Sequence, residues 1–256
     1  MIYFFSDSHL GLDSEAQQQK LVRMLRRMAT DAEAIYILGD LFDYWYEYLW
    51  PDRSKDTYAT ILNELHRIVD SGIPVHFYTG NHDLWTFGEL ARRSGMIVHK
   101  ARLDTITLYG KRIVLGHGDG LVPDGYLDML PEEVRGKVKK SIRINRLFHN
   151  PIAQAAFRLC PPALGNRLGY SWACKNRIKE QANPIPYKGE NQEELVLWAK
   201  QQGQGPDYYI FGHRHIELEL ELVSRARIIL LGDTFAQWTY ARLAPDGNIS
   251  TELYEE

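Results

Sequence analysis

Five short motifs of Asp, Asn and His residues recur along this chain, and most of them stand directly after a run of apolar residues. Their side chains offer carboxylate, amide and imidazole groups, a mixture that hard and borderline divalent metals accept. Structural zinc sites usually include cysteine, and none is present in these motifs. The motifs therefore predict a divalent-metal site, whose candidate ligands are Asp7, His9, Asp40, Asn81, His117, His213 and His215.

These ligand types suit a pair of metal ions that act together on phosphorus. Two ions about 3.5–4 Å apart clamp the attacking and leaving oxygens of a phosphoryl displacement. A bound ion also lowers the pKa of water from about 15.7 toward 7, so hydroxide becomes available near neutral pH. We therefore predict a two-metal hydrolase of a phosphoester or diphosphate bond. Mn²⁺ suits the mixed ligand set best, with Fe, Zn and Mg as alternatives.

Strand and helix patterns alternate between the first three motifs. This alternation predicts a parallel sheet with right-handed crossovers, whose strand ends meet at one crevice. If the chain stays extended after the first strand, Asp7 and His9 point to the same side. The predicted strands are residues 2–5, 34–38 and 75–78, and the predicted helices are residues 14–28 and 57–69.

The pattern changes in the second half of the chain. Residues 103–108 and 112–115 flank a hairpin signal. Further strands follow near the C-terminus, and we expect them to form a second, mixed or antiparallel sheet. They are predicted at residues 208–211, 216–222, 228–231, 238–243 and 250–254. Together these patterns predict a single α/β domain over residues 1–256.

Residues 123–190 fit neither sheet and predict an inserted set of helices. Residues 131–180 contain eleven Lys or Arg and three Glu, a net charge of +8 in a chain of net charge −3. The insertion is interpreted either as a helical subdomain that covers the sheet edge or as a substrate-recognition cap. Its charge indicates an anionic partner, for which an anionic membrane surface is the candidate. No stacking platform for single-stranded nucleic acid stands out, which argues against that partner.

The expected location is the cytoplasm, with peripheral contact at the inner membrane face. Two cysteines do not make a disulfide framework. The N-terminus does not have the pattern of a signal peptide, and no apolar run reaches the length of about 18 residues that a membrane span needs.

In their order, the five motifs resemble the pattern of the calcineurin-like metallophosphoesterase superfamily: D-x-H, G-D-x-x-D, G-N-H-D/E, H and G-H-x-H. The resemblance spans residues 7–215 and implies a two-sheet sandwich flanked by helices, with the metals at strand ends. It implies two overlapping ligand sets that share Asp40 as the bridge. One set is Asp7, His9, Asp40 and His215, and the other is Asp40, Asn81, His117 and His213.

The same resemblance implies catalytic roles for two residues of the third motif. His82 would contact the phosphate and protonate the leaving group, and Asp83 would orient His82. Asp43 is left with two interpretations, a residue behind a metal ligand or a local turn residue.

Within the superfamily, the chain resembles the UDP-2,3-diacylglucosamine hydrolases of lipid A biosynthesis. The resemblance rests on chain length, on residues 36–42, 116–119 and 124–126, and on the place of the insertion. It implies hydrolysis of UDP-2,3-diacylglucosamine to 2,3-diacylglucosamine 1-phosphate (lipid X) and UMP, with the acyl chains in the cap. The implied substrate contacts are Asn81, His82, Asp124, Tyr126, Ser171 and Lys175.

One residue departs from that group, because its characterised proteobacterial members carry Arg where this chain has His82. His82 is the general residue of the superfamily and permits general-acid chemistry. A different substrate therefore stays open: a nucleotide, a phosphodiester or a phosphoprotein. A non-catalytic scaffold on the same fold is the third alternative.

Overall fold

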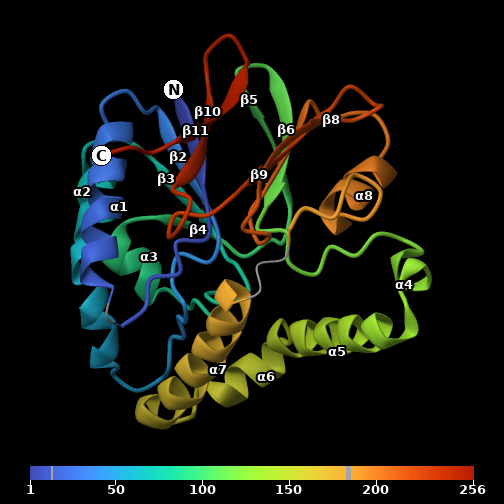
Figure 1. Ribbon diagram of the computed structural model, residues 1–256. Coiled ribbons are helices and arrows are strands. Elements are labelled where there is room, and N and C mark those ends of the chain that lie inside the picture. Colours follow the sequence, from blue (N-terminus) through green and yellow to red (C-terminus); the bar gives the residue numbers. More distant parts are fainter. Residues whose placement is uncertain (13, 183–185) are drawn as a thin grey trace.

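The computed structural model describes residues 1–12, 14–182 and 186–256, with side chains described for all of these except 174–182. Two mixed β-sheets lie face to face, and helices flank them (Figure 1). The predicted α/β two-sheet fold is confirmed.

The first sheet has the strand order β11-β10-β1-β2-β3-β4. Strands β1 to β4 run parallel, and β10 and β11 are antiparallel to their neighbours. The strands are β1 (Ile2–Phe5), β2 (Ala34–Leu38), β3 (Val75–Tyr78), β4 (Ile97–His99), β10 (Thr239–Leu243) and β11 (Ile249–Leu253).

The second sheet has the order β5-β6-β7-β9-β8. Strands β6, β7 and β9 are parallel, and β5 and β8 pair antiparallel at the two edges. The strands are β5 (Asp104–Leu108), β6 (Lys111–Gly116), β7 (Tyr208–Phe211), β8 (Glu217–Glu221) and β9 (Arg227–Leu231).

The expectation that all five C-terminal strands join the second sheet is wrong for the last two. β10 pairs antiparallel with β1, so that Phe4 lies opposite Ala241. Tyr240 packs with the core on the helix side of the sheet, whereas Ala241 packs between the two sheets. A strand that is buried on both faces belongs inside a covered sheet, and β10 meets this condition beside β1.

Alternation along the strands divides the core into layers. Tyr3 and Phe5 of β1 pack with the helix layer, while Ile2 and Phe4 pack against the second sheet. This layer contains helices α1 (Glu15–Met28), α2 (Ala59–Asp70) and α3 (Glu89–Ser94), and the 3-10 turn η1 (Arg53–Tyr58) precedes α2. Helix α8 (Glu194–Gln201) packs on the outer face of the second sheet.

Four helices between β6 and α8 lie beyond the strand ends, toward the bottom of Figure 1. The last three of them contact the sandwich through an aromatic cluster that joins Tyr44, Tyr46 and Trp85 to Phe148, Phe157 and Trp172. Among the described residues, no helix combines the length and apolar character that crossing a bilayer requires. The four helices are α4 (Tyr126–Met129), α5 (Glu132–Phe148), α6 (Pro151–Phe157) and α7 (Pro162–Ala182).

Candidate metal centre

The five motifs meet at one edge of the sandwich because each follows the carboxyl end of a strand. The strands are β1, β2 and β3 of the first sheet and β6 and β7 of the second. The seven predicted metal ligands converge here, and the carboxylates of Asp7 and Asp40 are buried.

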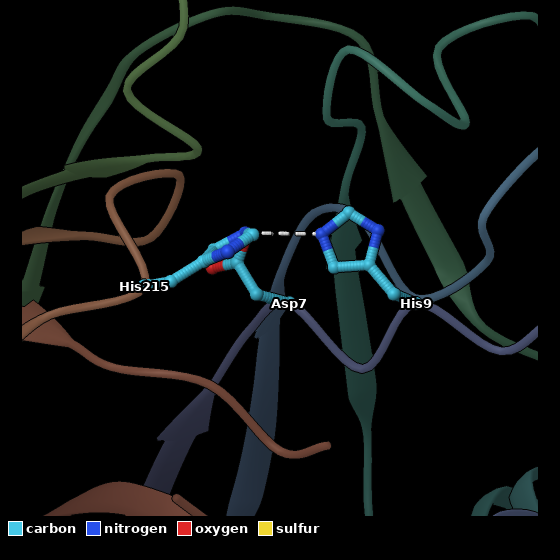
Figure 2. Close-up of side chains that lie close together, drawn as sticks. All are labelled: Asp7, His9 and His215. Atoms are coloured by element: carbon cyan, nitrogen blue, oxygen red, sulfur yellow. Dashed lines mark hydrogen bonds and ion pairs between the residues drawn. The ribbon is translucent and has the colours of Figure 1, made fainter. Parts of the chain in front are cut away.

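One group of side chains comprises Asp7, His9 and His215, whose positions Figure 2 shows. His215 Nε2 lies 3.2 Å from Asp7 Oδ1 and 3.1 Å from His9 Nε2. Asp7 Oδ1 is buried, and within the described part of the chain it has no hydrogen-bond partner. Two imidazole nitrogens that face an unsatisfied carboxylate oxygen form a donor set that fits a divalent cation.

A second group lies on the other side of Asp40. Its Oδ2 is 3.2 Å from His117 Nε2, which is also 3.3 Å from Asn81 Oδ1. The ring of His213 stands 5.1 Å from that of His117, centroid to centroid. Because Asp40 Oδ2 also lies 3.7 Å from His9 Nε2, this carboxylate stands between the two groups.

Two of the histidines are held so that Nε2 points into the centre. His117 Nδ1 donates to the carbonyl oxygen of Leu38 at 2.8 Å, and His9 Nδ1 lies 3.4 Å from Asp43 Oδ1. A partner behind the ring fixes the orientation that a metal ligand needs. Of the two interpretations of Asp43, the structure therefore favours the residue behind a ligand.

The backbone of the motifs is not extended, which corrects the expectation for Asp7 and His9. Five candidate ligands have a φ between 46° and 69°, in the left-handed region that non-glycine residues rarely adopt. Such strain persists only where surrounding structure supports it, and it clusters at functional sites. The five are Asp7, His9, Asp40, His213 and His215.

The motif glycines allow the loops to approach one another. A Cβ on Gly80 would stand 2.2 Å from Asp40 Oδ1, and one on Gly39 would stand 2.6 Å from His117 Nδ1. Since neither distance is compatible with a side chain, glycine at these positions brings Asp40 and His117 together.

The expected pairing of His82 with Asp83 is corrected. His82 Nδ1 donates instead to the carbonyl oxygen of Asp43 at 2.7 Å. The Asp83 carboxylate accepts backbone N–H groups from Gly80, Asp40, Leu41 and Phe42. Asp83 thus joins the loops of the second and third motifs. Burial and the nearby Asp40 raise its pKa to about 7, although the N–H donors favour its ionised form.

The electrostatics of the centre also fit a cation. Burial opposes a charge on His9, but Asp43 and Asp7 outweigh it and raise the pKa of His9 to about 10. Burial likewise opposes ionisation of Asp40, but His117 and His82 hold its pKa well below the usual range. In the metal-free protein, protons on histidine compensate the buried carboxylates, and a divalent cation provides the same compensation.

A cavity of about 380 Å³ adjoins the centre. Asn81, His82 and His213 line it from the motifs, and Phe148 and Trp172 line it from α5 and α7. Two further lining residues, Asn145 of α5 and Arg214 of the last motif, were missed by sequence reasoning. The sequence signal for Arg214 was its place between two candidate ligands.

Three of the remaining expected substrate contacts do not line this cavity. Asp124 is exposed, and its backbone N–H donates a hydrogen bond to Gln201 Oε1. The hydroxyl of Tyr126 donates to Glu194 at 2.7 Å. Ser171 is exposed on α7. Of the described residues that line the cavity, none is Asp124, Tyr126 or Ser171. The side chain of Lys175 lies outside the described residues.

A two-sheet α/β sandwich with buried Asp and His clusters at its strand ends defines the class of metal-dependent phosphoesterases. The family model described as Calcineurin-like phosphoesterase matches residues 1–217, and the chain belongs to this family. The UDP-2,3-diacylglucosamine hydrolase of Porphyromonas gingivalis is 32% identical over 94% of this chain and 92% of its own. That of Escherichia coli O7:K1 is 28% identical over 95% of both. Among solved structures, a novel archaeal phosphodiesterase is similar over 99% of both chains, with 10% identity and a TM-score of 0.41.

Proposed function

We propose that this phosphoesterase hydrolyses UDP-2,3-diacylglucosamine to UMP and 2,3-diacylglucosamine 1-phosphate. Water adds to the uridylyl phosphorus, and the P–O bond to the sugar phosphate breaks. The names of its relatives, at 28% and 32% identity over most of the chain, support this substrate. The observation that carries the proposal is a pair of adjoining cavities with different linings.

The second of these cavities has a volume of about 280 Å³ and a mainly apolar wall. Phe148 and Trp172 line both this cavity and the polar one beside the metal centre. A phosphoester with a polar head and acyl chains matches this arrangement, since ligand sites combine apolar walls with a few polar groups. The other apolar lining residues include Tyr44, Tyr46, Trp85, Leu147, Phe157 and Leu168.

The metal sites in this proposal follow the two groups of side chains. Asp7, His9, Asp40 and His215 would hold one ion, and Asp40, Asn81, His117 and His213 would hold the other. The distances around Asp40 and the unsatisfied Asp7 Oδ1 support this assignment. The ions, for which we propose Mn²⁺, would supply Lewis-acid polarisation of the phosphoryl oxygens and would lower the pKa of the attacking water.

Side chains of the third motif position the phosphate in this scheme. Asn81 and His82 both line the cavity. Because the Nδ1 of His82 donates to the Asp43 carbonyl, Nε2 is the ring nitrogen available to the substrate. When both ring nitrogens carry a proton, Nε2 can donate to the phosphate and pass that proton to the leaving oxygen. Burial opposes this form by lowering the pKa of His82, and the nearby Asp40 carboxylate favours it. Asp83 supports the step by holding the loop that carries both residues.

The four inserted helices serve as the cap in this scheme and meet an anionic membrane at the cytoplasmic face. Large apolar side chains are exposed on α5 to α7, among them Ile152 at 79% exposure. Basic side chains accompany them, a combination that suits a lipid interface. Binding to vesicles that contain anionic lipid should fall as salt is added.

The experiment that tests the substrate is release of UMP from UDP-2,3-diacylglucosamine by the Mn²⁺-loaded protein. We expect this reaction to exceed, in kcat/KM, hydrolysis of mononucleotides, oligonucleotides and phosphopeptides by at least a hundredfold. Asp40→Ala serves as the control for metal-dependent turnover and should be inactive. A higher kcat/KM for mononucleotides, oligonucleotides or phosphopeptides would contradict the proposed lipid substrate. Retained activity in Asp40→Ala would contradict the two-metal assignment.

A further inference from the structure

The cavity beside the metal centre contains one permanent cation among the residues that the structure describes in its wall. That cation is Arg214, whose side chain is 13% exposed. Two carboxylates also line the cavity, Asp119 and Glu194, and both have partners. Asp119 accepts from Asn145 and His149, and Glu194 accepts from Tyr126.

A buried glutamate holds Arg214 in place. Glu193, which is fully buried, lies immediately before α8 and accepts from Arg214 Nε at 2.5 Å and from Nη2 at 3.2 Å. This pairing uses one edge of the guanidinium, which has five N–H donors in all. Nη1 has no acceptor among the described residues, so the other edge keeps donors for a ligand in the cavity.

The position of Arg214 in the sequence indicates that the free edge of its guanidinium lies near the phosphate-binding part of the site. Its neighbours are the proposed ligands His213 and His215, so a phosphate held at the metal centre lies next to the loop that carries Arg214. A fixed guanidinium recognises phosphate oxygens through paired, charge-assisted hydrogen bonds. A diphosphate brings a second phosphate beside the first, and the wall of the same cavity offers Arg214 to it.

We propose that Arg214, positioned by Glu193, binds the phosphate on the leaving side of a diphosphate substrate and thereby selects diphosphate diesters over simple phosphodiesters. The proposal rests on the proposed function, because it assumes that a diphosphate is cleaved at the metal centre. It assigns the recognition of the leaving phosphate to a residue of the sandwich, whereas the apolar cavity receives the acyl chains.

The test compares two soluble probes that bind without acyl chains. One is UDP-N-acetylglucosamine, which has two phosphates, and the other is the methyl ester of UMP, which has one. Their dissociation constants are measured by calorimetry on the full chain with Mn²⁺. We expect the native protein to bind the diphosphate at least tenfold more tightly. Arg214→Met should weaken diphosphate binding about 10- to 100-fold, the range of a lost charge-assisted hydrogen bond. Binding of the monophosphate probe should change less than threefold.

Two further variants keep this test decisive if Arg214→Met leaves Glu193 as an uncompensated buried charge. The double variant Arg214→Met, Glu193→Gln removes that charge and should lose the same preference. Arg214→Lys keeps a cation and should retain part of it. Arg242→Met is the matched control, since Arg242 also pairs with a glutamate but lies away from the cavity. It should bind both probes as the native protein does.

Two results would overturn the role of Arg214. The first is a native protein that binds both probes equally. The second is an equal loss of both affinities in Arg214→Met together with a loss of bound Mn²⁺, because this would mean that the ion pair only fixes the histidine loop. A third result would separate the two proposals. If the protein releases no UMP from the lipid substrate but still binds the diphosphate probe more tightly than the monophosphate probe, the proposed substrate is wrong and the role of Arg214 is supported.

Discussion

Replacing Asp83 with Asn tests whether this carboxylate maintains the metal centre through the backbone. The side chain is buried and accepts from four N–H groups. Gly80 and Leu41 donate at 2.8 Å and 2.7 Å, and Asp40 and Phe42 donate at 3.2 Å and 3.3 Å. Each carboxylate oxygen therefore serves two donors. The variant keeps the size of the side chain while replacing one acceptor oxygen with an amino group.

The expected loss of stability follows from the donors that are left without an acceptor. An asparagine oxygen can serve one pair of N–H groups, while the amino group faces the other pair. A buried donor without a partner costs about 1–3 kcal/mol, and neighbouring losses are not additive. We expect the free energy of unfolding to fall by about 2–4 kcal/mol. For a chain of this size the melting temperature should fall by roughly 4–16 °C.

Thermal unfolding and metal content, measured on the same preparations, distinguish two roles for Asp83. If it holds the loops of Asp40 and Gly80, Asp83→Asn lowers stability and Mn²⁺ affinity together. If it orients a catalytic ring, activity falls while both of these properties stay unchanged, and that result would refute our interpretation. Asp246→Asn makes the same chemical change at an exposed turn. It should leave the melting temperature as it is in the native protein.

Two other predictions concern the cavity and the metals. Phe157→Ala and Leu168→Ala should each raise KM for the diacylated substrate by about 5- to 100-fold, because each removes a large apolar contact from the apolar cavity and neither lines the cavity beside the metal centre. Hydrolysis of an aryl phosphodiester by the same two variants should change less than twofold, and an equal loss on both substrates would argue against an acyl site. Chelation should lower the melting temperature, and Mn²⁺ at a hundred times its dissociation constant should restore about 2.7 kcal/mol of stability for each site that it fills. No shift on chelation, in protein shown to lose its metal, would contradict a cation at the Asp7 and Asp40 carboxylates.

Sequence reasoning placed the strands that carry the motifs because each is a short apolar run that ends at a small or polar residue. It missed β4 and α3, which have three and six residues and lie between Gly88 and His99. Elements this short have little periodicity, and tertiary packing decides their conformation. It also assigned β10 to the wrong sheet, because pairing with β1 depends on contacts between residues more than 200 positions apart.

The residue types of the metal centre could be predicted, but the local backbone could not. Asp7 and His9 adopt left-handed conformations that long-range hydrogen bonds support. The N–H of Asp7 donates to the Gly39 carbonyl at 3.0 Å, and that of His9 donates to the Asp40 carbonyl at 2.9 Å. The first and second motifs therefore support each other's conformation. No local propensity predicts such an arrangement, since it exists only once both strands are paired.

In the structure, the apolar and the basic side chains of the insertion have different locations, which its composition could not show. The wall that it gives to the cavities is apolar, from Phe148 and Trp172, with Asn145 as a polar group. The side chains of Lys137, Lys139, Lys140, Arg143 and Arg146 are exposed, and three of them line a further cavity of about 460 Å³ together with Arg102. In the cavity beside the metal centre, as far as its wall is described, the fixed cation is Arg214 of the sandwich. We therefore propose that the exposed basic side chains of the insertion meet an anionic surface, and that the metal centre and Arg214 bind the phosphates of the substrate. Charge-reversing substitutions at Lys139 and Arg143 should accordingly weaken binding to anionic vesicles, whereas kcat/KM for a soluble diphosphate should change less.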